Sequence, residues 1–534
     1  MPRRRPVVRF MKPTKGSHQA STIPSNPRTS SDEWSDASDP TRAAEDDTDV
    51  DETYLFNPAM PTLAQNSTIP SLFTNPPFLK DPLTTVTSEA QDAVVEQCLP
   101  FMSGAPVADD EDDADPETLT PNARGVPRLL RQKHVEFLEG ALGKLPAGFM
   151  GMDATRPWML YWALNGLMLL GEDISVYRER VIYTLAPMQN PDGGFGGGHG
   201  QMSHCASTYA AVLSLALVGG EDAYDMIDRE AMWRFYARVK QPDGGFALCV
   251  GGEEDVRGAY CAMVVITLLD LPLLLPADAP AQDGADATFL TGLPEYLASC
   301  QTYEGGISAS PGREAHGGYA FCAMACLSLI DVPHRILPQY LDMATLTSWL
   351  SARQYSPEGG FSGRTNKLVD GCYSHWVGGC FPILEAALTG PTSGSSDNAQ
   401  NVSRSLYSRE GLIRYILCCC QQEIGGMRDK PEKPADSYHT SYILSGLSSA
   451  QNKYATIYTP SQKGEETSPL SAAFHWSVTE LPSTPEHSLN SDSEGVDGGL
   501  FGPEDRVGVV HPIFVMPWGV GEAMRKYYEG KRGV

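Results

Sequence analysis

Helical segments of two kinds alternate along the chain. The segments Ser207–Val218, Ala259–Leu269 and Thr440–Ala450 contain almost only apolar and small residues, which is typical of helices buried on all sides. The segments that precede them, such as Arg229–Gln241 (REAMWRFYARVKQ), have one apolar and one polar face and should lie outside. This pattern needs few strands. It predicts an all-α fold in which outer helices surround inner ones.

A glycine pair recurs between the outer and the inner helix of each unit, after a helix end that contains glutamine. The loops read QNPDGGFGGG, QPDGGF, QTYEGGIS, QYSPEGGFSG and QQEIGGM. Their first glycines are Gly193, Gly244, Gly305, Gly359 and Gly425. The spacings of 51, 61, 54 and 66 residues indicate a repeat architecture. We therefore predict an α/α toroid, a barrel of six helical hairpins whose inner helices all begin at one mouth.

The same register brings chemically active residues to this mouth. Eleven residues after each first glycine stands a polar residue that can cap an inner helix: His204, Asp255, His316, Asp370 and Asp436. Two and three residues further on, the register holds Cys372 in one repeat and His439 in another. Asp370, Cys372 and His439 are therefore predicted neighbours, although 67 residues separate the last two.

A carboxylate, a thiolate and an imidazole are all ligands of Zn²⁺. Three protein ligands leave the fourth tetrahedral position open, as in catalytic zinc sites. The same three residues also fit a purely structural interpretation, in which Asp370 is a helix cap, Cys372 a buried thiol and His439 a core histidine. Because a shared register brings them together, we favour the metal site.

Basic residues surround the predicted metal site. The loop GRTNKLVDGCYSHW carries Arg364 and Lys367 next to Asp370, and Arg257 and His316 begin neighbouring inner helices. Helix N-termini and basic side chains attract anions, which indicates a site for phosphate groups. Arg257 also follows three acidic residues and could merely offset their charge.

Aromatic residues occupy the same inner helices. They are Trp158, Trp162, Tyr209, Tyr260, Trp376 and Tyr442. Each one alone is typical of a core, but together they indicate an apolar pocket. A substrate with a hydrocarbon chain at one end and a phosphate ester at the other would fit all of these features.

The distribution of charge along the chain indicates which residues fold and which do not. The chain has 534 residues and a net charge of −26, which argues against a generic nucleic-acid binder. Much of this charge lies in two acidic runs, 31–52 and 109–117, which are typical of solvated, disordered segments. We predict a disordered acidic extension over 1–120, the barrel over 121–451, a low-complexity insertion over 452–496 and a closing segment over 497–534.

The twelve cysteines form no disulfide framework, because several lie inside apolar helical patterns. They are typical of reduced thiols in a cytoplasmic protein. The N-terminus has no apolar core of signal-peptide length, and we expect no membrane span.

Between Asp153 and Gln451 the chain resembles the β subunits of protein farnesyltransferases, the CaaX prenyltransferase β-subunit family. The resemblance rests on DATRPWMLYW, QNPDGGFGGGHGQ, GGEEDVRGAYC, GGFSGRTNKLVDGCYSHW and DKPEKPADSYHTSYILSGLS, and on HPIFVMP near the end. It implies that Asp370, Cys372 and His439 bind one Zn²⁺ per subunit. It also implies that the catalytic contacts with the diphosphate are made by His316, Arg364, Lys367 and Tyr373.

The resemblance also implies which residues bind substrate. The isoprenoid channel would be lined by Arg257, Tyr260, Gly318, Cys322, Trp158, Trp162 and Trp376. Tyr438 would lie between the peptide and the zinc, and Asp429 would serve Mg²⁺ bound with the diphosphate. Trp158 and Tyr442 match the bulky residues that favour farnesyl over geranylgeranyl. The family's phenylalanine before the Tyr-His pair is Ser437 here, so peptide contacts should differ.

In that family the zinc-bound thiolate of a CaaX cysteine attacks C1 of farnesyl diphosphate. The expected partners are an all-helical α subunit, farnesyl diphosphate and CaaX-ending proteins such as small GTPases, with no nucleic acid. Two alternatives stay open: a geranylgeranyltransferase β subunit, and a non-catalytic barrel scaffold. A terpene cyclase would need an acidic D-x-D-D motif. The one match, Asp110–Asp113, lies in an acidic run and is attributed to chance.

Overall fold

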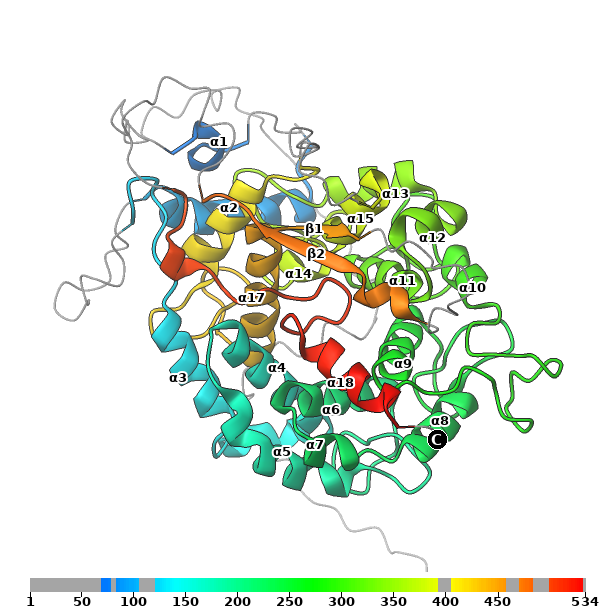
Figure 1. Ribbon diagram of the computed structural model, residues 1–534. Helices are drawn as coiled ribbons and strands as arrows, with labels where there is room; N and C mark the ends of the chain where they lie inside the picture. The colour runs from blue at the N-terminus through cyan, green and yellow to red at the C-terminus, as the bar shows by residue number, and fades with distance from the viewer. Residues whose placement is uncertain are drawn as a thin grey trace, which may run out of the picture. The chain divides into compact units, whose positions relative to one another are not determined.

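The computed structural model describes residues 69–77, 83–104, 121–391, 405–457, 470–483 and 499–531, which all lie in the unit Asn66–Val534. The acidic runs 31–52 and 109–117, with the Asp110–Asp113 motif, fall outside these ranges. Helices dominate the described residues, and the α/α toroid is confirmed (Figure 1). Among these helices, none is long and apolar enough to cross a membrane.

The inner layer is a closed ring of apolar helices. Its members are α4 (Arg156–Leu169), α6 (Cys205–Val218), α9 (Val256–Leu268), α11 (Gly317–Ile330), α14 (Tyr373–Trp376) with α15 (Cys380–Thr389), and α17 (Ser437–Gln451). Each packs on the next, and α17 packs back on α4, which closes the ring. In α6 nearly every side chain is buried, as its composition predicts.

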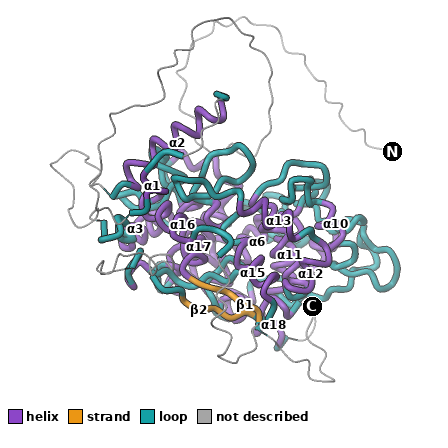
Figure 2. Tube along the Cα trace, turned by 90° about the horizontal axis from the view of Figure 1, so that it is seen from above, coloured by secondary structure: helices purple, strands orange, loops and turns teal. Residues whose placement is uncertain are grey.

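Shorter amphipathic helices form the outer layer around this ring (Figure 1), and Figure 2 shows the same structure turned by 90°. They are α3 (Arg131–Ala141), α5 (Arg178–Leu185), α8 (Arg229–Val239), α10 (Leu293–Ser299), α13 (Met343–Ser351) and α16 (Arg409–Arg414), which continues into the π-helical turn η5 (Tyr415–Cys420). Connecting elements are η1 (Ala147–Thr155), η2 (Ile174–Tyr177), η3 (Ala186–Met188), α7 (Glu221–Asp225), α12 (Pro333–Tyr340), η8 (Pro503–Asp505) and α18 (Val520–Glu529).

Glycine is required where each loop packs against the next outer helix. Gly193 has φ +91°, and a Cβ there would lie 1.8 Å from the carbonyl oxygen of Ala231 in α8. Gly425, in the last of the five loops, has φ +97°, and its Cβ would lie 2.2 Å from the carbonyl oxygen of Lys133 in α3. Only glycine tolerates both restrictions. The last loop thus meets the first outer helix, and the outer layer closes as well.

The repeated glutamine joins each hairpin to the start of the next. The Gln421 amide accepts from the Leu130 backbone N–H at 2.8 Å and donates to the Arg128 carbonyl at 3.1 Å. Gln189 makes the same pair of bonds, to Asp228 and Met226. These side chains satisfy backbone groups that a helix terminus leaves without partners. In the second loop Lys240, rather than Gln241, lies at the equivalent position, and its Nζ donates to the Gly244 carbonyl at 2.5 Å.

Ordered elements also lie inside the range 1–120, which the sequence predicts to be disordered, and inside the predicted low-complexity insertion 452–496. Within 1–120, the structure describes α1 (Ser71–Thr74) and α2 (Val86–Met102). Helix α2 begins with a capping box and buries an apolar face against η5, which gives it the packing that most helices need. Within 452–496, β1 (Asn452–Thr456) and β2 (Trp476–Glu480) pair antiparallel, and η6 (Ser471–Phe474) lies between them in the sequence. The domain boundaries themselves stay a prediction.

Candidate functional site

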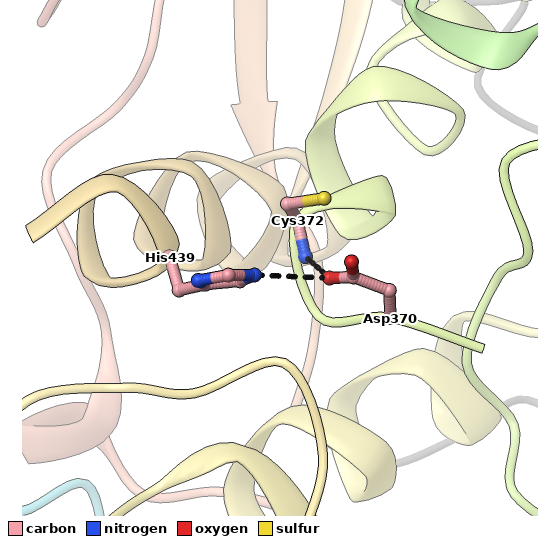
Figure 3. A group of neighbouring side chains, drawn as sticks. All are labelled: Asp370, Cys372 and His439. Carbon is pink, nitrogen blue, oxygen red and sulfur yellow. Dashed lines mark hydrogen bonds and ion pairs between the residues drawn. The ribbon is translucent and has the colours of Figure 1, made fainter. Parts of the chain in front are cut away.

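The side chains of Asp370, Cys372 and His439 meet at the beginnings of two adjacent inner helices (Figure 3). Cys372 is the N-cap of α14, Asp370 lies two residues before it, and His439 is in the first turn of α17. Their ligating atoms all lie within 4.8 Å of one another. The predicted juxtaposition is confirmed, and it arises because α14 and α17 pack side by side.

The contacts of the His439 ring suit a metal ligand. Nδ1 of His439 lies 2.7 Å from Oδ2 of Asp436. Nε2 lies 3.3 Å from Oδ1 of Asp370, but it is buried and makes no hydrogen bond within the described residues. When one ring nitrogen of a histidine binds a metal, the other usually donates a hydrogen bond to a group such as a carboxylate, as Nδ1 of His439 can here. These three residues could therefore hold a metal ion.

Contacts within the group set the protonation states of its members. Burial lowers the pKa of His439, but its contacts with Asp370 and Asp436 outweigh burial and raise that pKa. Burial raises the pKa of Asp370, but its contact with His439 and the charge of Lys430 outweigh burial and lower that pKa to about 2. Burial, together with the Asp370 charge, raises the pKa of the Cys372 thiol. The carboxylate is thus ionised at neutral pH, while the thiol keeps its proton until a cation displaces it.

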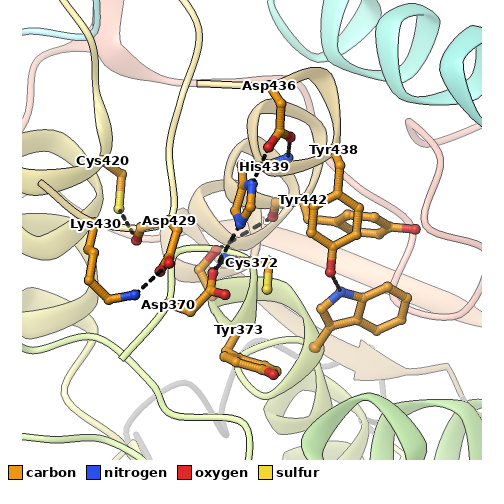
Figure 4. Close-up of polar contacts among 12 residues, drawn as sticks. Asp370, Cys372, Tyr373, Cys420, Asp429, Lys430, Asp436, Tyr438, His439 and Tyr442 are labelled. Carbon is orange, nitrogen blue, oxygen red and sulfur yellow. Dashed lines mark hydrogen bonds and ion pairs between the residues drawn. The ribbon is translucent and has the colours of Figure 1, made fainter. Parts of the chain in front are cut away.

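A second buried carboxylate lies beside this group (Figure 4). Oδ2 of Asp429 pairs with Nζ of Lys430 at 2.5 Å, while Oδ1 is buried and makes no hydrogen bond among the described residues. The Asp429 carbonyl accepts from the Gly371 N–H and the Tyr415 hydroxyl, each at 2.8 Å. Burial and the Asp370 charge raise the pKa of Asp429 to about 7. The structure therefore brings Asp429 next to the metal group, as the sequence predicts for a residue of the site.

His316, at the start of the neighbouring inner helix α11, forms a hydrogen-bonded pair with Tyr373 of α14. His316 caps α11, and its Nδ1 accepts from the Gly318 N–H at 3.0 Å. Its Nε2 lies 3.0 Å from the Tyr373 hydroxyl. Burial and the charges of Arg364 and Arg257 lower the pKa of His316 to about 4. The ring is therefore neutral at pH 7. Because Nδ1 accepts a hydrogen bond, Nε2 carries the ring proton and donates a hydrogen bond to the Tyr373 hydroxyl.

The predicted basic residues differ in how they are held. Arg364 pairs with Glu314, and Arg257 pairs with Asp255, Nε to Oδ2 at 2.9 Å. Both arginines act on the pKa of His316, so both lie near it. Lys367 is exposed and makes no ion pair within the described part of the chain. The structure thus brings Arg257, Arg364 and His316 together, and leaves Lys367 at the rim.

Five aromatic residues form what we call the aromatic wall: Trp158, Trp162, Trp376, Tyr438 and Tyr442. Their rings are connected, with centroids 5.5 Å apart for Trp158–Trp162, 5.4 Å for Trp162–Tyr438, 5.0 Å for Tyr438–Tyr442 and 4.5 Å for Trp376–Tyr442. Nε1 of Trp376 donates to the Tyr438 hydroxyl at 3.0 Å. The three tryptophans and Tyr438 are half-buried, so part of each side chain stays accessible.

The remaining predicted residues continue the aromatic wall along the inner helices. The Tyr209 and Tyr260 rings lie 5.5 Å apart, and Tyr260 contacts Phe321 at 5.7 Å. Cys322 is buried beside them in α11. A Cβ at Gly318 would lie 3.3 Å from Nδ1 of His316 and 4.0 Å from the Trp376 ring, so glycine leaves free space between these two side chains.

The sequence interpretation missed two residues at this site. Asp436 was predicted only as a helix cap, yet its carboxylate also binds the His439 ring. Its position three residues before His439 is the signal that could have shown this. Lys430, the partner of Asp429, was not singled out, because an adjacent acid and base in a loop are common at protein surfaces.

The sequence profile of the prenyltransferase alpha-alpha toroid domain matches residues 129–516. The protein farnesyltransferase subunit beta of Pyricularia oryzae is 51% identical over 453 residues, which are 84% of this chain and 82% of that protein. This chain belongs to the family of protein farnesyltransferase β subunits. The family member of Schizosaccharomyces pombe is 38% identical over 397 residues, which are 74% of this chain and 90% of that protein.

Relatives with another printed activity are more distant from this farnesyltransferase β-family chain. The geranylgeranyl transferase type-1 subunit beta of Arabidopsis thaliana is 26% identical over 60% of this chain and 84% of that protein. A solved structure, Candida albicans protein geranylgeranyltransferase-I complexed with GGPP, covers 75% of this chain and 99% of that chain, with a TM-score of 0.53 at 20% identity. At that identity the likeness concerns the fold.

Proposed function

We propose that this chain is the catalytic β subunit of a protein farnesyltransferase. It would transfer farnesyl from farnesyl diphosphate to the cysteine thiol of a C-terminal CaaX motif, together with an α subunit, in the cytoplasm. The proposal rests above all on one observation: the Asp370, Cys372 and His439 side chains meet beside the aromatic wall and beside Arg257 and Arg364, which surround His316 and which we call the cationic cluster. The 51% identity to a protein named farnesyltransferase subunit beta supports farnesyl as the lipid.

Asp370, Cys372 and His439 would hold one Zn²⁺. The donor set of one oxygen, one sulfur and one nitrogen fits this ion and leaves a fourth position for substrate. Nε2 of His439 supports the assignment, because it is buried, makes no hydrogen bond within the described residues and lies 3.3 Å from Oδ1 of Asp370, so that one metal ion could contact both atoms. When bound, the ion lowers the pKa of a substrate thiol and holds it as thiolate.

The cationic cluster would stabilise the departing diphosphate. His316, Arg364, Lys367 and Tyr373 supply donors and positive charge where negative charge grows in the transition state. Arg364 would exchange its carboxylate partner Glu314 for the diphosphate. Asp429, whose Oδ1 makes no hydrogen bond within the described chain, would bind the Mg²⁺ that accompanies the diphosphate.

The aromatic wall would hold the hydrocarbon chain. Trp158 and Tyr442 are the bulky residues expected to exclude the longer geranylgeranyl group, and Tyr438 would lie between the peptide and the zinc. Two observations support farnesyl as the lipid: the higher sequence identity to farnesyltransferase β subunits, and the bulky Trp158. If the enzyme transferred the longer lipid faster, the chain would instead be a geranylgeranyltransferase β subunit.

The proposal is tested by transfer to a CaaX peptide, with this chain co-expressed with a farnesyltransferase α subunit. We expect zinc-dependent farnesyl transfer, and its loss together with bound zinc in Cys372→Ala. Cys326→Ala is the matched control, because Cys326 is an equally buried thiol of the inner helix α11. No transfer by a zinc-loaded heterodimer would refute an enzymatic function and leave the scaffold.

A further inference from the structure

The segment His511–Met516, which we call the plug, enters the ring of inner helices from the end opposite the mouth. Its base is tied to the far ends of α4 and α17: the Gly508 N–H donates to the Leu169 carbonyl at 2.7 Å, and the Ser448 hydroxyl donates to the Gly508 carbonyl at 2.8 Å. The chain then crosses the middle of the ring and continues into α18 (Figure 1). The plug closes on itself through the His511 N–H, which donates to the Met516 carbonyl at 2.7 Å.

Tyrosines of three consecutive inner helices, α4, α6 and α9, bind the backbone of the plug. They donate to three consecutive carbonyl groups: Tyr161 to Val515 at 2.7 Å, Tyr209 to Phe514 at 3.4 Å and Tyr260 to Ile513 at 2.8 Å. All three tyrosines and these plug residues are buried. Because an unpaired buried carbonyl is costly, each hydroxyl holds one peptide group in place.

The tip of the plug is strained. Val515 has φ +58°, a conformation that β-branched residues rarely adopt. Such strain persists only where the surroundings hold the backbone firmly, and it is concentrated at functional sites. Here the holding contacts come from Nδ1 of His511, which accepts from the Ile513 N–H at 3.2 Å, and from the Phe514 ring, which packs 5.3 Å from Phe474 of η6.

The plug is connected directly to the aromatic wall. The rings of Tyr161 and Tyr209 lie 5.8 and 5.7 Å from Trp158. Trp158 in turn stacks on Trp162 at 5.5 Å. A shift of the plug would therefore be transmitted through two tyrosines to the tryptophan that is expected to limit lipid length.

We propose that the plug is the stop that sets how long an isoprenoid chain the barrel accepts, and that Tyr161, Tyr209 and Tyr260 are positioning residues that hold it. This inference rests on the proposed function and deepens it. While the tyrosines hold the plug, Tyr161 and Tyr209 keep Trp158 of the aromatic wall in place, and the lipid site is only long enough for farnesyl. With the plug released, the wall can yield, and a longer chain fits.

The test uses the heterodimer with the double variant Tyr161→Phe, Tyr260→Phe, which removes two hydroxyls and keeps both rings. Tyr528→Phe is the matched control, because this buried hydroxyl donates to the Tyr224 carbonyl at 2.7 Å outside the ring. Two quantities are measured: hydrogen exchange of the amides of residues 511–516, and kcat/KM for geranylgeranyl and farnesyl diphosphate. A second variant, with Phe514 and Val515 deleted, shortens the plug itself.

We expect faster exchange of the plug amides in the double variant and about a tenfold rise in the geranylgeranyl-to-farnesyl ratio of kcat/KM, since one neutral hydrogen bond contributes roughly a factor of two to ten. The deletion should raise the ratio further. An unchanged ratio in a folded variant would overturn the proposal, and so would unchanged exchange, because the hydroxyls would then not hold the plug. Failure of the wild-type heterodimer to transfer either lipid would instead refute the proposed function.

Discussion

The Asp436 carboxylate serves both the backbone and the side chain of His439. Its Oδ1 accepts from the His439 N–H at 2.7 Å, which caps α17, and its Oδ2 lies 2.7 Å from Nδ1 of the ring (Figure 4). One residue thus begins the helix and turns Nε2 of His439 toward Asp370 and Cys372. The cap and the candidate metal centre are parts of one local structure.

We predict that Asp436→Asn weakens zinc binding about tenfold, at the lower end of the usual effect of outer-shell partners. Asparagine still caps a helix, so the loss should come from the weaker hold on the imidazole and not from unfolding. Zinc affinity is measured by competition with a chelator. Asp228→Asn, a change at the cap of α8, is the control. Equal zinc affinity of Asp436→Asn and wild type would show that the carboxylate does not orient the ring.

Tyr373→Phe should lower kcat for lipid transfer about ten- to a hundredfold, because a donor to the developing charge of the diphosphate is lost. The KM for the peptide and the zinc content should stay near their wild-type values. Tyr407→Phe is the control, since this tyrosine is buried and its hydroxyl makes no hydrogen bond within the described residues. A rise in KM with unchanged kcat would contradict the assignment, since it would mean that Tyr373 serves binding alone.

Trp158→Thr should admit the longer lipid. The indole contacts both Trp162 and Tyr209, and its removal opens space inside the ring of helices. We expect the geranylgeranyl-to-farnesyl ratio of kcat/KM to rise at least about tenfold, the usual effect of one or more methylenes in an apolar pocket. Trp233→Thr, on the outer helix α8, removes a tryptophan far from the wall and serves as control. Unchanged selectivity would remove Trp158 from the lipid site.

Glu358 should make stability depend on pH. Burial raises its pKa from the usual 4.5 to about 7, although it accepts from Gln91 of α2 at 2.7 Å. Between these two pH values the unfolded chain ionises and the folded one does not, so the free energy of unfolding falls as pH rises and then levels off. Glu358→Gln should abolish this loss and stabilise the protein at pH 8 by up to about 3 kcal/mol.

Denaturant unfolding of wild type and Glu358→Gln at pH 5 and pH 8 measures this effect. The two proteins should differ little at pH 5 and most at pH 8. The exposed Glu423→Gln is the control and should change neither value. A variant that is equally destabilised at both pH values would show that Glu358 is ionised in the folded state.

Gly446→Ala should disturb the metal centre from a distance. A Cβ at Gly446 of α17 would lie 2.5 Å from the Ser374 carbonyl carbon of α14, so the two helices must separate. These helices carry His439 and Cys372. We expect a loss of about 1–3 kcal/mol of unfolding free energy and weaker zinc binding. Gly140→Ala in α3 is the control, because its Cβ meets nothing within 4 Å and should stabilise the helix. Wild-type zinc affinity in Gly446→Ala would contradict the coupling.

Regular spacing explains why much of the site was predictable. The five glycine-pair loops and the apolar helices after them repeat, so equivalent offsets in sequence become equivalent depths in the ring. For this reason the sequence alone could predict that four residues lie close together, and the structure confirms that they meet in one region: His316, Asp370, Cys372 and His439. The meaning of the repeated glutamine was not predictable, because Gln421 binds Leu130, which lies 291 residues away.

The sequence by itself determined the repeated helical hairpins of this protein, their order and the register of its chemical groups, because apolar periodicity and glycine turns act over short distances. The tertiary structure decided which partners these groups meet. Closure of α17 onto α4, the pairing of Arg364 with Glu314 and the insertion of the plug beneath Tyr161 join segments that share no period. Such contacts depend on packing between distant parts of the chain, which no local pattern specifies.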